Sequence, residues 1–414
     1  MTSRQEIDGF RSQVRTWLAE YHHPGLSGQE WLQLVVDRGY AVPTWSPEWY
    51  GLGVSAELAA VISEEFRLAQ ATGSDQDKRN LWANTLLTYG TEGLKRRLIR
   101  PLLLDEAKMC LLYSEPGAGS DLAGLRTRAD RDGDEFVITG QKVWTSWARG
   151  ADYGMLIART DWDVPKHRGL SFFFFPMKQP GVVVRPIKQI TGESHFNEVF
   201  IDGARIPPEN LLGRINEGWQ VLQTALAYER SVMGDLARGP RRFEPPADGG
   251  ADSVPPGASG AEVDLVALAR EAGRAGDPLV RQAVAHIYTL RAVNRWNGQR
   301  AKAQLRQGSS SPILSLGKLA MSRILHEGAR VQSAILGAES MLVGSDHPRG
   351  DAANFLALNA YFTSIGGGTD EIQRNIIAER ILGLPREVDA DRDVPFRDAR
   401  KTTTQHRPGL GATE

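Results

Sequence analysis

Several features that would define a specialised class of protein are scarce or missing in this chain of 414 residues. It contains one cysteine, Cys110, which excludes an internal disulfide framework and a structural zinc site built on cysteine. The net charge is −1 with histidine neutral, so there is no overall basic field to attract nucleic acid. The most apolar stretch, residues 170–177, is too short to span a bilayer, and the N-terminus lacks a basic-then-apolar signal pattern. We therefore expect a soluble, cytoplasmic protein with no nucleic-acid partner and no membrane insertion.

What is present is the composition of an ordinary folded chain. Hydrophobic residues make up 41% and charged residues 24% of the sequence, which excludes a wholly disordered protein. At roughly 150 residues per domain, the length corresponds to about three domains or to one large compact unit. The histidines show no metal-ligand spacing such as His-Glu-x-x-His, so no metal site is predicted.

The spacing of apolar residues divides the chain into helical, β-rich and again helical parts. Up to about residue 104 the spacing is three or four, as in Ile7, Phe10 and Val14, and Ser55 is a good N-cap. From about residue 106, β-rich runs lie beside the hairpin-type turn signals Asp132-Gly133 and Asp202-Gly203. No segment of helical length separates these runs, which favours an antiparallel sheet over βαβ units.

The helical period returns after residue 212, and Thr369 caps the last helix that it predicts. Residues 239–260 are rich in Gly, Pro and Ala and are predicted to form an exposed, flexible loop. The polar, aperiodic residues 386–414 predict a tail that is mobile or clasps a partner. The sequence thus predicts an α+β protein with an N-terminal α-helical domain (1–105), a central antiparallel β-barrel or sandwich domain (106–212), a C-terminal helical bundle (213–385) and the tail.

Three glycine- or tryptophan-containing segments could carry chemistry, and each has a structural alternative. The first segment is residues 113–124, with the sequence Tyr-Ser-Glu-Pro-Gly-Ala-Gly-Ser-Asp-Leu-Ala-Gly. Its glycines would let an anion approach the backbone closely, although segments of this composition more often form a tight surface loop. In residues 140–147, Trp144 could stack on a flat ring or pack in the core. Glycines 366–368, before Thr369, are equally compatible with an anion-binding turn and with a hinge.

Glu229 is a carboxylate with apolar neighbours on its predicted helix. The residues three and four positions away are Ala225, Leu226, Val232 and Met233. Burial among them would raise the pKa of Glu229 toward the range that a general base needs. The alternative, and the commoner case, is a structural ion pair with an arginine from elsewhere in the chain.

Taken together, these segments resemble those of the acyl-CoA dehydrogenase family. The match rests on Tyr-Ser-Glu-Pro-Gly-Ala-Gly-Ser-Asp at 113–121, Gly-Gln-Lys-Val-Trp-Thr-Ser at 140–146 and Gly-Gly-Thr-Asp-Glu-Ile-Gln-Arg at 367–374, in that order. The similarity extends over about residues 5–385, apart from the 239–260 stretch. It implies FAD held between the sheet domain and the C-terminal helices, α,β-dehydrogenation of an acyl-CoA thioester, and transfer of electrons to an electron-transfer flavoprotein.

The resemblance also implies roles for single residues. Trp144 would stack near the flavin, Ser146 would hydrogen-bond close to its N5 atom, and Gly367 would polarise the substrate carbonyl through its N–H. The other residues implied in FAD binding are Tyr113, Ser114, Gly119, Ser120, Thr145, Gly337, Thr369 and Glu371, and those implied in substrate binding besides Gly367 are Ser120 and Arg230.

The chain departs from the commonest family pattern at the catalytic base. Many members carry the catalytic glutamate immediately before Gly-Thr, where this chain has Gly367. A smaller group, resembling the isovaleryl- and long-chain-specific enzymes, carries it on the earlier helix just before an arginine, and Glu229-Arg230 matches that position. Our hypothesis is that Glu229 is the base and that Arg230 helps to organise the site.

The stretches that grip FAD across a subunit interface in this family also depart from the common pattern. Residues 270–276 lack the usual Phe-Gly pair, and residues 334–340 lack the usual Gln and Gly-Gly-x-Gly. A homotetramer and a heterotetramer with a paralogous subunit are both compatible with this. Two other functions stay open: a flavin-supporting subunit whose partner performs catalysis, and a flavin oxidase or monooxygenase on the same fold.

Overall fold

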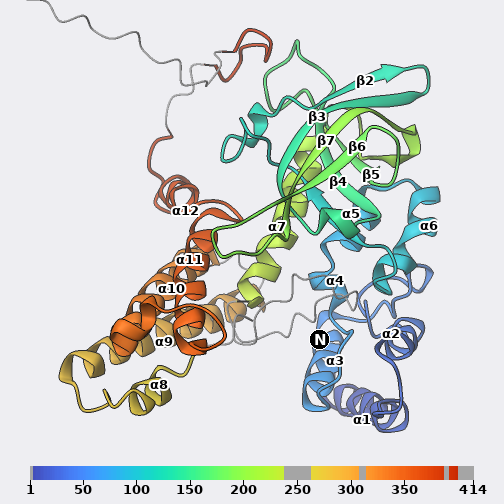
Figure 1. Ribbon diagram of the computed structural model, residues 1–414. Coiled ribbons are helices and arrows are strands. Elements are labelled where there is room, and N and C mark those ends of the chain that lie inside the picture. The colour runs from blue at the N-terminus through green and yellow to red at the C-terminus, as the bar shows by residue number, and fades with distance from the viewer. Residues whose placement is uncertain (1–2, 237–262, 307–313, 387–390, 400–414) are drawn as a thin grey trace, which may run out of the picture. The chain divides into compact units, whose positions relative to one another are not determined.

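The computed structural model describes residues 3–236, 263–306, 314–386 and 391–399 (Figure 1). The chain forms two compact units. Unit 1 comprises residues 1–186, 196–225 and 388–414, and unit 2 comprises residues 187–195 and 226–387. The predicted loop 239–260 lies outside the described residues, and so does the predicted tail apart from residues 386 and 391–399.

Unit 1 begins with helices whose starts follow from local capping. Ser55 Oγ accepts a hydrogen bond of 3.4 Å from Leu58 N, as the sequence predicts, and Ser27 forms a capping box with Glu30. The buried faces of these helices carry residues at helical spacing, such as Val14 and Leu18. The helices are α1 (Arg4–Tyr21), α2 (Gly28–Asp37), α3 (Ala56–Leu68), α4 (Gln76–Arg79), α5 (Leu81–Tyr89) and α6 (Glu92–Leu103), with a 3-10 turn η1 (Pro47–Trp49).

A mixed sheet follows in unit 1. Its strands are β1 (Met109–Leu112), β2 (Arg128–Asp132), β3 (Glu135–Ser146), β4 (Tyr153–Arg159), β5 (Leu170–Pro176), β6 (Val182–Ile187), β7 (Phe196–Ile206) and β8 (Leu211–Leu212). They are ordered β6-β7-β3-β2-β4-β5-β8, and β1 pairs with β4. Most neighbours are antiparallel, as predicted, but β1 and β2 each run parallel to β4. A parallel pair needs a long connection, and the chain between β1 and β4 includes loop 113–124 and the β2–β3 hairpin.

The two turn signals in the β-rich region have different outcomes. Gly133 (φ 61°) lies in a two-residue turn between β2 and β3, where Asp132 pairs with Glu135. The prediction of a turn at Asp202-Gly203 is wrong, because β7 continues through these residues. Gly203 (φ 68°) is instead the extra residue of a β-bulge opposite β3. A glycine in the left-handed region serves a bulge as well as a turn.

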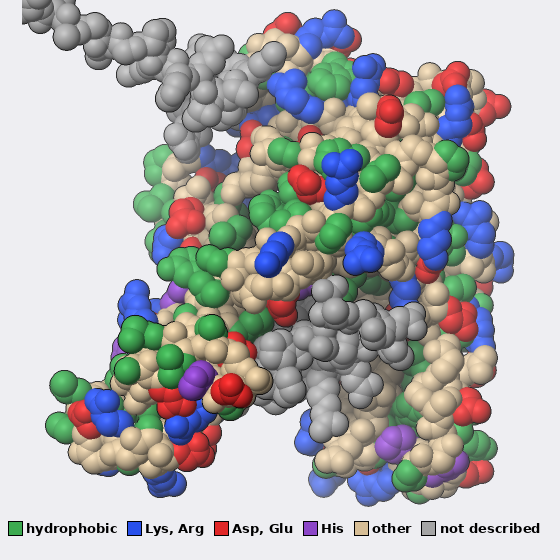
Figure 2. All heavy atoms as spheres, viewed as in Figure 1, with side chains coloured by type: hydrophobic (Ala, Val, Ile, Leu, Met, Phe, Trp, Pro, Cys, Tyr) green, Lys and Arg blue, Asp and Glu red, His purple; other side chains and the backbone are tan. Residues whose placement is uncertain are grey.

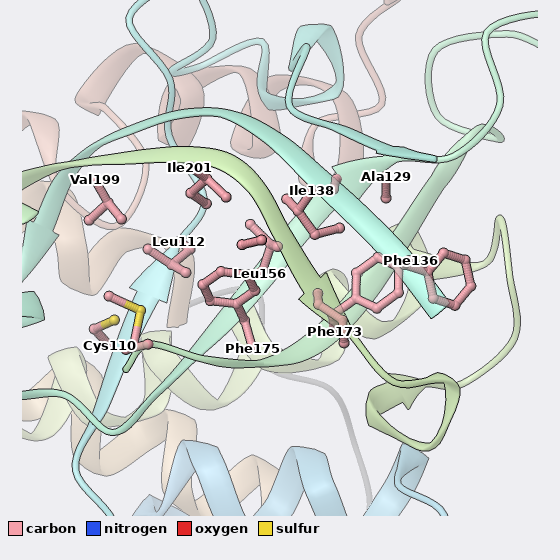
Figure 3. Close-up of a cluster of buried hydrophobic side chains, with 14 of the residues drawn as sticks. Cys110, Leu112, Ala129, Phe136, Ile138, Leu156, Phe173, Phe175, Val199 and Ile201 are labelled. Carbon is pink, nitrogen blue, oxygen red and sulfur yellow. The ribbon is translucent and has the colours of Figure 1, made fainter. Parts of the chain in front are cut away.

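The core of the sheet region is built from inward-facing residues of β1, β3, β4, β5 and β7 (Figure 3). Phe173 and Phe175, two residues apart on β5, face the same side of the sheet and belong to one cluster with Leu156 of β4 and Ile138 of β3. Cys110 lies in this cluster and is buried. Burial raises the pKa of its thiol to about 12.

Unit 2 is helical. Its core joins α8, α9 and α10 through Leu268, Ile287 and Ile335, among others, and α10 also packs against α11. Thr369 caps the last helix, accepting from Ile372 N at 3.2 Å, as predicted. The helices are α7 (Gly218–Leu236), which begins in unit 1, then α8 (Leu265–Glu271), α9 (Pro278–Arg306), α10 (Leu314–Leu336), α11 (Pro348–Ile365) and α12 (Asp370–Ile376), with a 3-10 turn η5 (Gly337–Met341) and a short π-helix η6 (Ile377–Ile381).

The surface carries charges of both signs. On the face shown in Figure 2, Lys and Arg side chains are interspersed with Asp and Glu. Among the described residues, the helices are too short or too polar to cross a membrane.

Candidate functional site

Two of the three predicted segments meet in unit 1. The N–H of Val143, near the end of β3, donates to the carbonyl oxygen of Ser114 at 2.9 Å. Loop 113–124 therefore starts directly beside the strand that carries Trp144. The third segment, residues 366–371, belongs to unit 2.

A buried ion pair holds the first end of loop 113–124. The Lys142 ammonium is fully buried and donates to Glu115 Oε1 at 2.9 Å, to Tyr113 O at 3.0 Å and to Ile157 O at 2.9 Å. Glu115 also accepts the N–H groups of Arg126 at 2.6 Å and Thr127 at 2.9 Å, which closes the loop on itself.

Glu115 and Lys142 affect each other's ionisation. Burial alone would raise the pKa of Glu115, but the Lys142 charge and the hydrogen-bond donors hold that pKa below its usual value. Burial lowers the pKa of Lys142, and the carboxylate opposes that shift. Sequence reasoning missed this pair, although a lysine in an otherwise apolar inward-facing row of β3 was a usable signal.

Beyond the Lys142–Glu115 pair, the tip of loop 113–124 is open to solvent. Glu115 and Ala118 exchange backbone hydrogen bonds of 3.0 and 3.1 Å, which leaves Pro116 and Gly117 at the tip. A Cβ built on Gly117 or Gly119 would meet no atom within 4 Å. Together with the exposed Ser120, this leaves the backbone accessible to a bound group.

The second end of loop 113–124 is held by hydrogen bonds from Arg159, the last residue of β4. Its guanidinium donates from Nη2 to Ala123 O at 2.6 Å and from Nε to Leu125 O at 3.2 Å. The backbone N–H of Arg159 donates to Thr127 O at 2.7 Å. The loop is thus fixed at both ends by buried cations, and neither role was predicted from the sequence.

The Trp144 side chain is exposed on the sheet, and its backbone conformation is strained. Its φ is 61° and its side chain is 59% exposed, while Trp147 (φ 59°) is 45% exposed. The pairing of β3 with β7 shifts register between Lys142 and Thr145, so Trp144 lies in a bulge. Left-handed backbone at tryptophan costs energy and is concentrated at functional sites. The structure therefore favours a ring available for stacking over core packing.

The hydroxyl residues after Trp144 face different environments. Ser146 is half-buried, whereas the Thr145 side chain is buried. Thr145 Oγ1 has no hydrogen-bond partner in the part of the chain that is described. An exposed indole, nearby hydroxyls and an open glycine backbone form a donor set that fits the flat ring and phosphates of FAD.

In unit 2, the glycine turn before α12 is set by its neighbours. Gly367 (φ 66°) and Gly368 (φ 90°) are in the left-handed region, which favours glycine. The first residue of α12, Asp370, accepts from Lys318 Nζ at 3.1 Å and Ser322 Oγ at 2.8 Å on α10. Ser322 Oγ also bonds Ser364 Oγ of α11 at 2.8 Å, so three helices converge on the end of this turn.

Of the remaining predicted residues, Glu371 is the second residue of α12, next to that turn, and it is exposed and pairs with Arg374 at 3.1 Å. Gly337 follows the C-terminal end of α10, whereas Thr369 precedes Asp370, which is held by Lys318 and Ser322 of α10. At 1.5 Å per residue, Gly337 is about 22 Å along the helix from Ser322. Glu229 and Arg230 lie on α7, and their side chains are outside the described part of the structure.

Comparisons with known proteins identify the family of the chain. Residues 110–203 match the acyl-CoA dehydrogenase middle domain, and residues 257–382 match the acyl-CoA dehydrogenase C-terminal domain. The chain is 35% identical to acyl-CoA dehydrogenase IpdE1 of Mycobacterium tuberculosis, over 92% of this chain and 99% of that protein. It is also 35% identical to acyl-CoA dehydrogenase FadE34 of the same organism, over 92% of this chain and 49% of FadE34.

Solved structures show the same relationship. The Tcur3481-Tcur3483 steroid ACAD has a TM-score of 0.66 and 26% identity, over 93% of this chain and 99% of that chain. The ChsE4-ChsE5 complex from Mycobacterium tuberculosis has a TM-score of 0.63 and 26% identity, over 94% of this chain and 99% of that chain. The chain therefore belongs to the acyl-CoA dehydrogenase family of FAD-dependent oxidoreductases.

Proposed function

We propose that this chain catalyses α,β-dehydrogenation of an acyl-CoA thioester, with Glu229 as the base that removes the α-proton. When bound, FAD would supply the acceptor for the β-hydride, and an electron-transfer flavoprotein would then receive the electrons. Loop 113–124 and residues 144–146 would hold this cofactor. The Gly367 N–H donates to the thioester carbonyl, where negative charge develops as the α-proton leaves.

The observation that carries the proposal is the identity of residue 367. Glycine occupies the position where many family members have their catalytic carboxylate, and glycine cannot accept a proton. On α7, Leu222 and Ala225 are buried, and Glu229 follows Ala225 by four residues, the spacing of one helical face. Position 229 therefore falls on the same helical face as these buried residues, and a carboxylate buried there would have a raised pKa, as a general base needs.

The test is replacement of Glu229 by Gln in the FAD-loaded protein. The variant should keep its yellow colour but show no flavin bleaching with acyl-CoA under anaerobic conditions. Glu217→Gln, just before the same helix, is the matched control and should bleach normally, since the Glu217 side chain is exposed and forms a surface pair of 3.9 Å with Arg214. Full reduction of the Glu229→Gln protein would reject Glu229 as the base.

We also infer that the acyl group is bulky and ring-containing. The support is the steroid ACAD similar to nearly the whole chain at 26% identity. A titration with short, branched, long and steroid-derived acyl-CoAs should show the highest kcat/KM for the steroid-derived thioesters. Equal or better turnover of a short straight chain would contradict this substrate class without affecting the role of Glu229.

A second candidate is a subunit that shares its FAD site with a different chain. Gly337 and Thr369 are both implied in FAD binding, but Gly337 follows the end of α10, whereas Thr369 precedes Asp370, which bonds Ser322 about 22 Å earlier along that helix. This separation is expected if the two residues serve different copies of the cofactor. Two of the solved relatives are named as two-component proteins. Native mass spectrometry of the purified chain tests this. A fully active homotetramer with one FAD per chain would exclude the shared arrangement with a paralogue.

A further inference from the structure

A short C-terminal segment, residues 391–399, is bound to unit 1. The N–H of Phe396 donates to Val164 O at 2.9 Å, and the N–H of Arg397 donates to Trp162 O at 3.0 Å. Pro395 forms a β-bridge with Pro165, and Arg397 pairs with Asp163. The segment therefore packs against the loop between β4 and β5 through backbone hydrogen bonds and one isolated β-bridge.

Phe396 covers the guanidinium that supports loop 113–124. Its ring is 5% exposed, and the Arg159 Cζ atom lies 3.5 Å from the ring centroid. The indole of Trp162 packs beside the same ring, with centroids 5.5 Å apart. Arg159 is fully buried, and no ion pair with a carboxylate is found for it within the described residues. The aromatic face takes the place that a counter-ion commonly occupies.

Arg159 connects this segment to the loop. Its side chain donates to Ala123 O and Leu125 O, at the end of loop 113–124, and to Lys166 O at 3.2 Å. Hydrogen bonds from a cation are strengthened where water is excluded, and Phe396 closes one face of the guanidinium to solvent. Burial also lowers the pKa of Arg159 to about 10, in keeping with a dry setting.

We propose that Phe396 is a positioning residue for cofactor binding: clamped on Arg159, it keeps residues 123–125 in place and so holds loop 113–124 in the shape that binds FAD. This inference rests on the proposed cofactor role of that loop. The C-terminal segment acts through Arg159 and touches no reacting atom. Without the ring, water competes for the guanidinium donors and the far end of the loop loosens.

The experiment compares hydrogen exchange and FAD affinity in the full-length chain. In the FAD-free protein, Phe396→Ala should speed amide exchange of residues 113–127 about tenfold, the factor that 1.4 kcal/mol represents. The dissociation constant for FAD should rise by a similar factor. Phe396→Tyr keeps an aromatic face and should restore both values, while Phe396→Leu, which keeps apolar volume only, should restore them in part.

Two controls separate positioning from general destabilisation. Asp398→Ala alters an exposed residue of the same segment and should change neither measurement. Amides of α3 should exchange at the wild-type rate in every variant. Unchanged exchange of residues 113–127 in Phe396→Ala, or equal acceleration in α3, overturns the positioning role. Faster loop exchange with unchanged FAD affinity would instead overturn the cofactor role of the loop.

Discussion

Lys142 and Glu115, separated by 27 residues in the sequence, are joined by a hydrogen-bonded ion pair of 2.9 Å beneath the start of loop 113–124. The lysine side chain is 0% and the glutamate side chain 9% exposed. A buried pair is weak evidence of added stability, but loss of one partner leaves the other as an uncompensated buried charge. The pair therefore makes the shape of the loop depend on a residue of β3.

Replacing Lys142 by Met should destabilise unit 1 strongly. It leaves the Glu115 carboxylate buried without its cation, which costs about 3–5 kcal/mol in comparable cases. Urea unfolding followed by tryptophan fluorescence measures the loss. The control is Arg96→Met, which breaks an exposed pair with Glu48 and should cost less than about 1 kcal/mol. A loss of stability as small as that of Arg96→Met would mean that the Glu115 carboxylate is solvated or protonated in the Lys142→Met protein.

Glu115 should also give the protein an acid-sensitive component of stability. Its pKa is lower in the folded chain than the ordinary carboxyl value of 4.5, so its stabilising contribution is present above pH 4.5 and is lost as the pH falls through the folded value. Urea midpoints measured from pH 7 down to pH 3 should fall more steeply for the wild type than for Glu115→Gln. Glu209→Gln, at an exposed position, should follow the wild-type slope. Parallel curves for all three proteins would contradict the prediction.

Trp144→Gly should affect stability and cofactor binding in opposite directions. Glycine relieves the left-handed backbone, worth about 1–2 kcal/mol, and little packing is lost because the indole is exposed. FAD affinity should fall about tenfold, since ring stacking contributes about 0.5–1.5 kcal/mol beyond buried area. Gln70→Gly (φ 53°, exposed) is a matched control that should gain stability and leave FAD affinity unchanged. Thermal melts of apoprotein and fluorescence titration with FAD provide both values.

Asp370→Ala should loosen the start of α12. It removes the acceptor for Lys318 and Ser322, and Ser322 is buried, so we expect a loss of about 1–3 kcal/mol. Hydrogen exchange of residues 366–374 should accelerate accordingly. Glu327→Ala breaks a pair of 3.7 Å with Arg323 at the surface of α10 and serves as the control, with little change expected. Equal exchange in both variants would show that Asp370 does not organise the turn.

The sequence predicted best those features that depend on neighbouring residues. Helix caps such as Ser55 and Thr369 need only a side chain and a backbone N–H three residues later, so they are recognisable locally. Apolar spacing likewise separated the helical parts from the sheet. The family resemblance rests on contiguous motifs of the same kind, and the similarity to IpdE1 over nearly the whole chain confirms it.

The features that escaped prediction depend on residues far apart in the sequence. Whether Gly203 makes a turn or a bulge is decided by pairing with β3, some sixty residues earlier. The parallel pairing of β1 with β4 depends on the path of the chain between them. The roles of Lys142 and Arg159 depend on carbonyl groups that tertiary structure brings to them. A cation in an apolar strand is the local sign that such a role exists.

The setting of Cys110 bears on the durability of a flavin enzyme. Reduced flavins that meet oxygen release hydrogen peroxide, and peroxide attacks the thiolate form of cysteine. With a pKa of about 12, the only thiol in the chain is almost entirely protonated at neutral pH, and it is shielded in the core of the sheet. We therefore expect repeated turnover in air to leave the protein's one sulfhydryl group unoxidised.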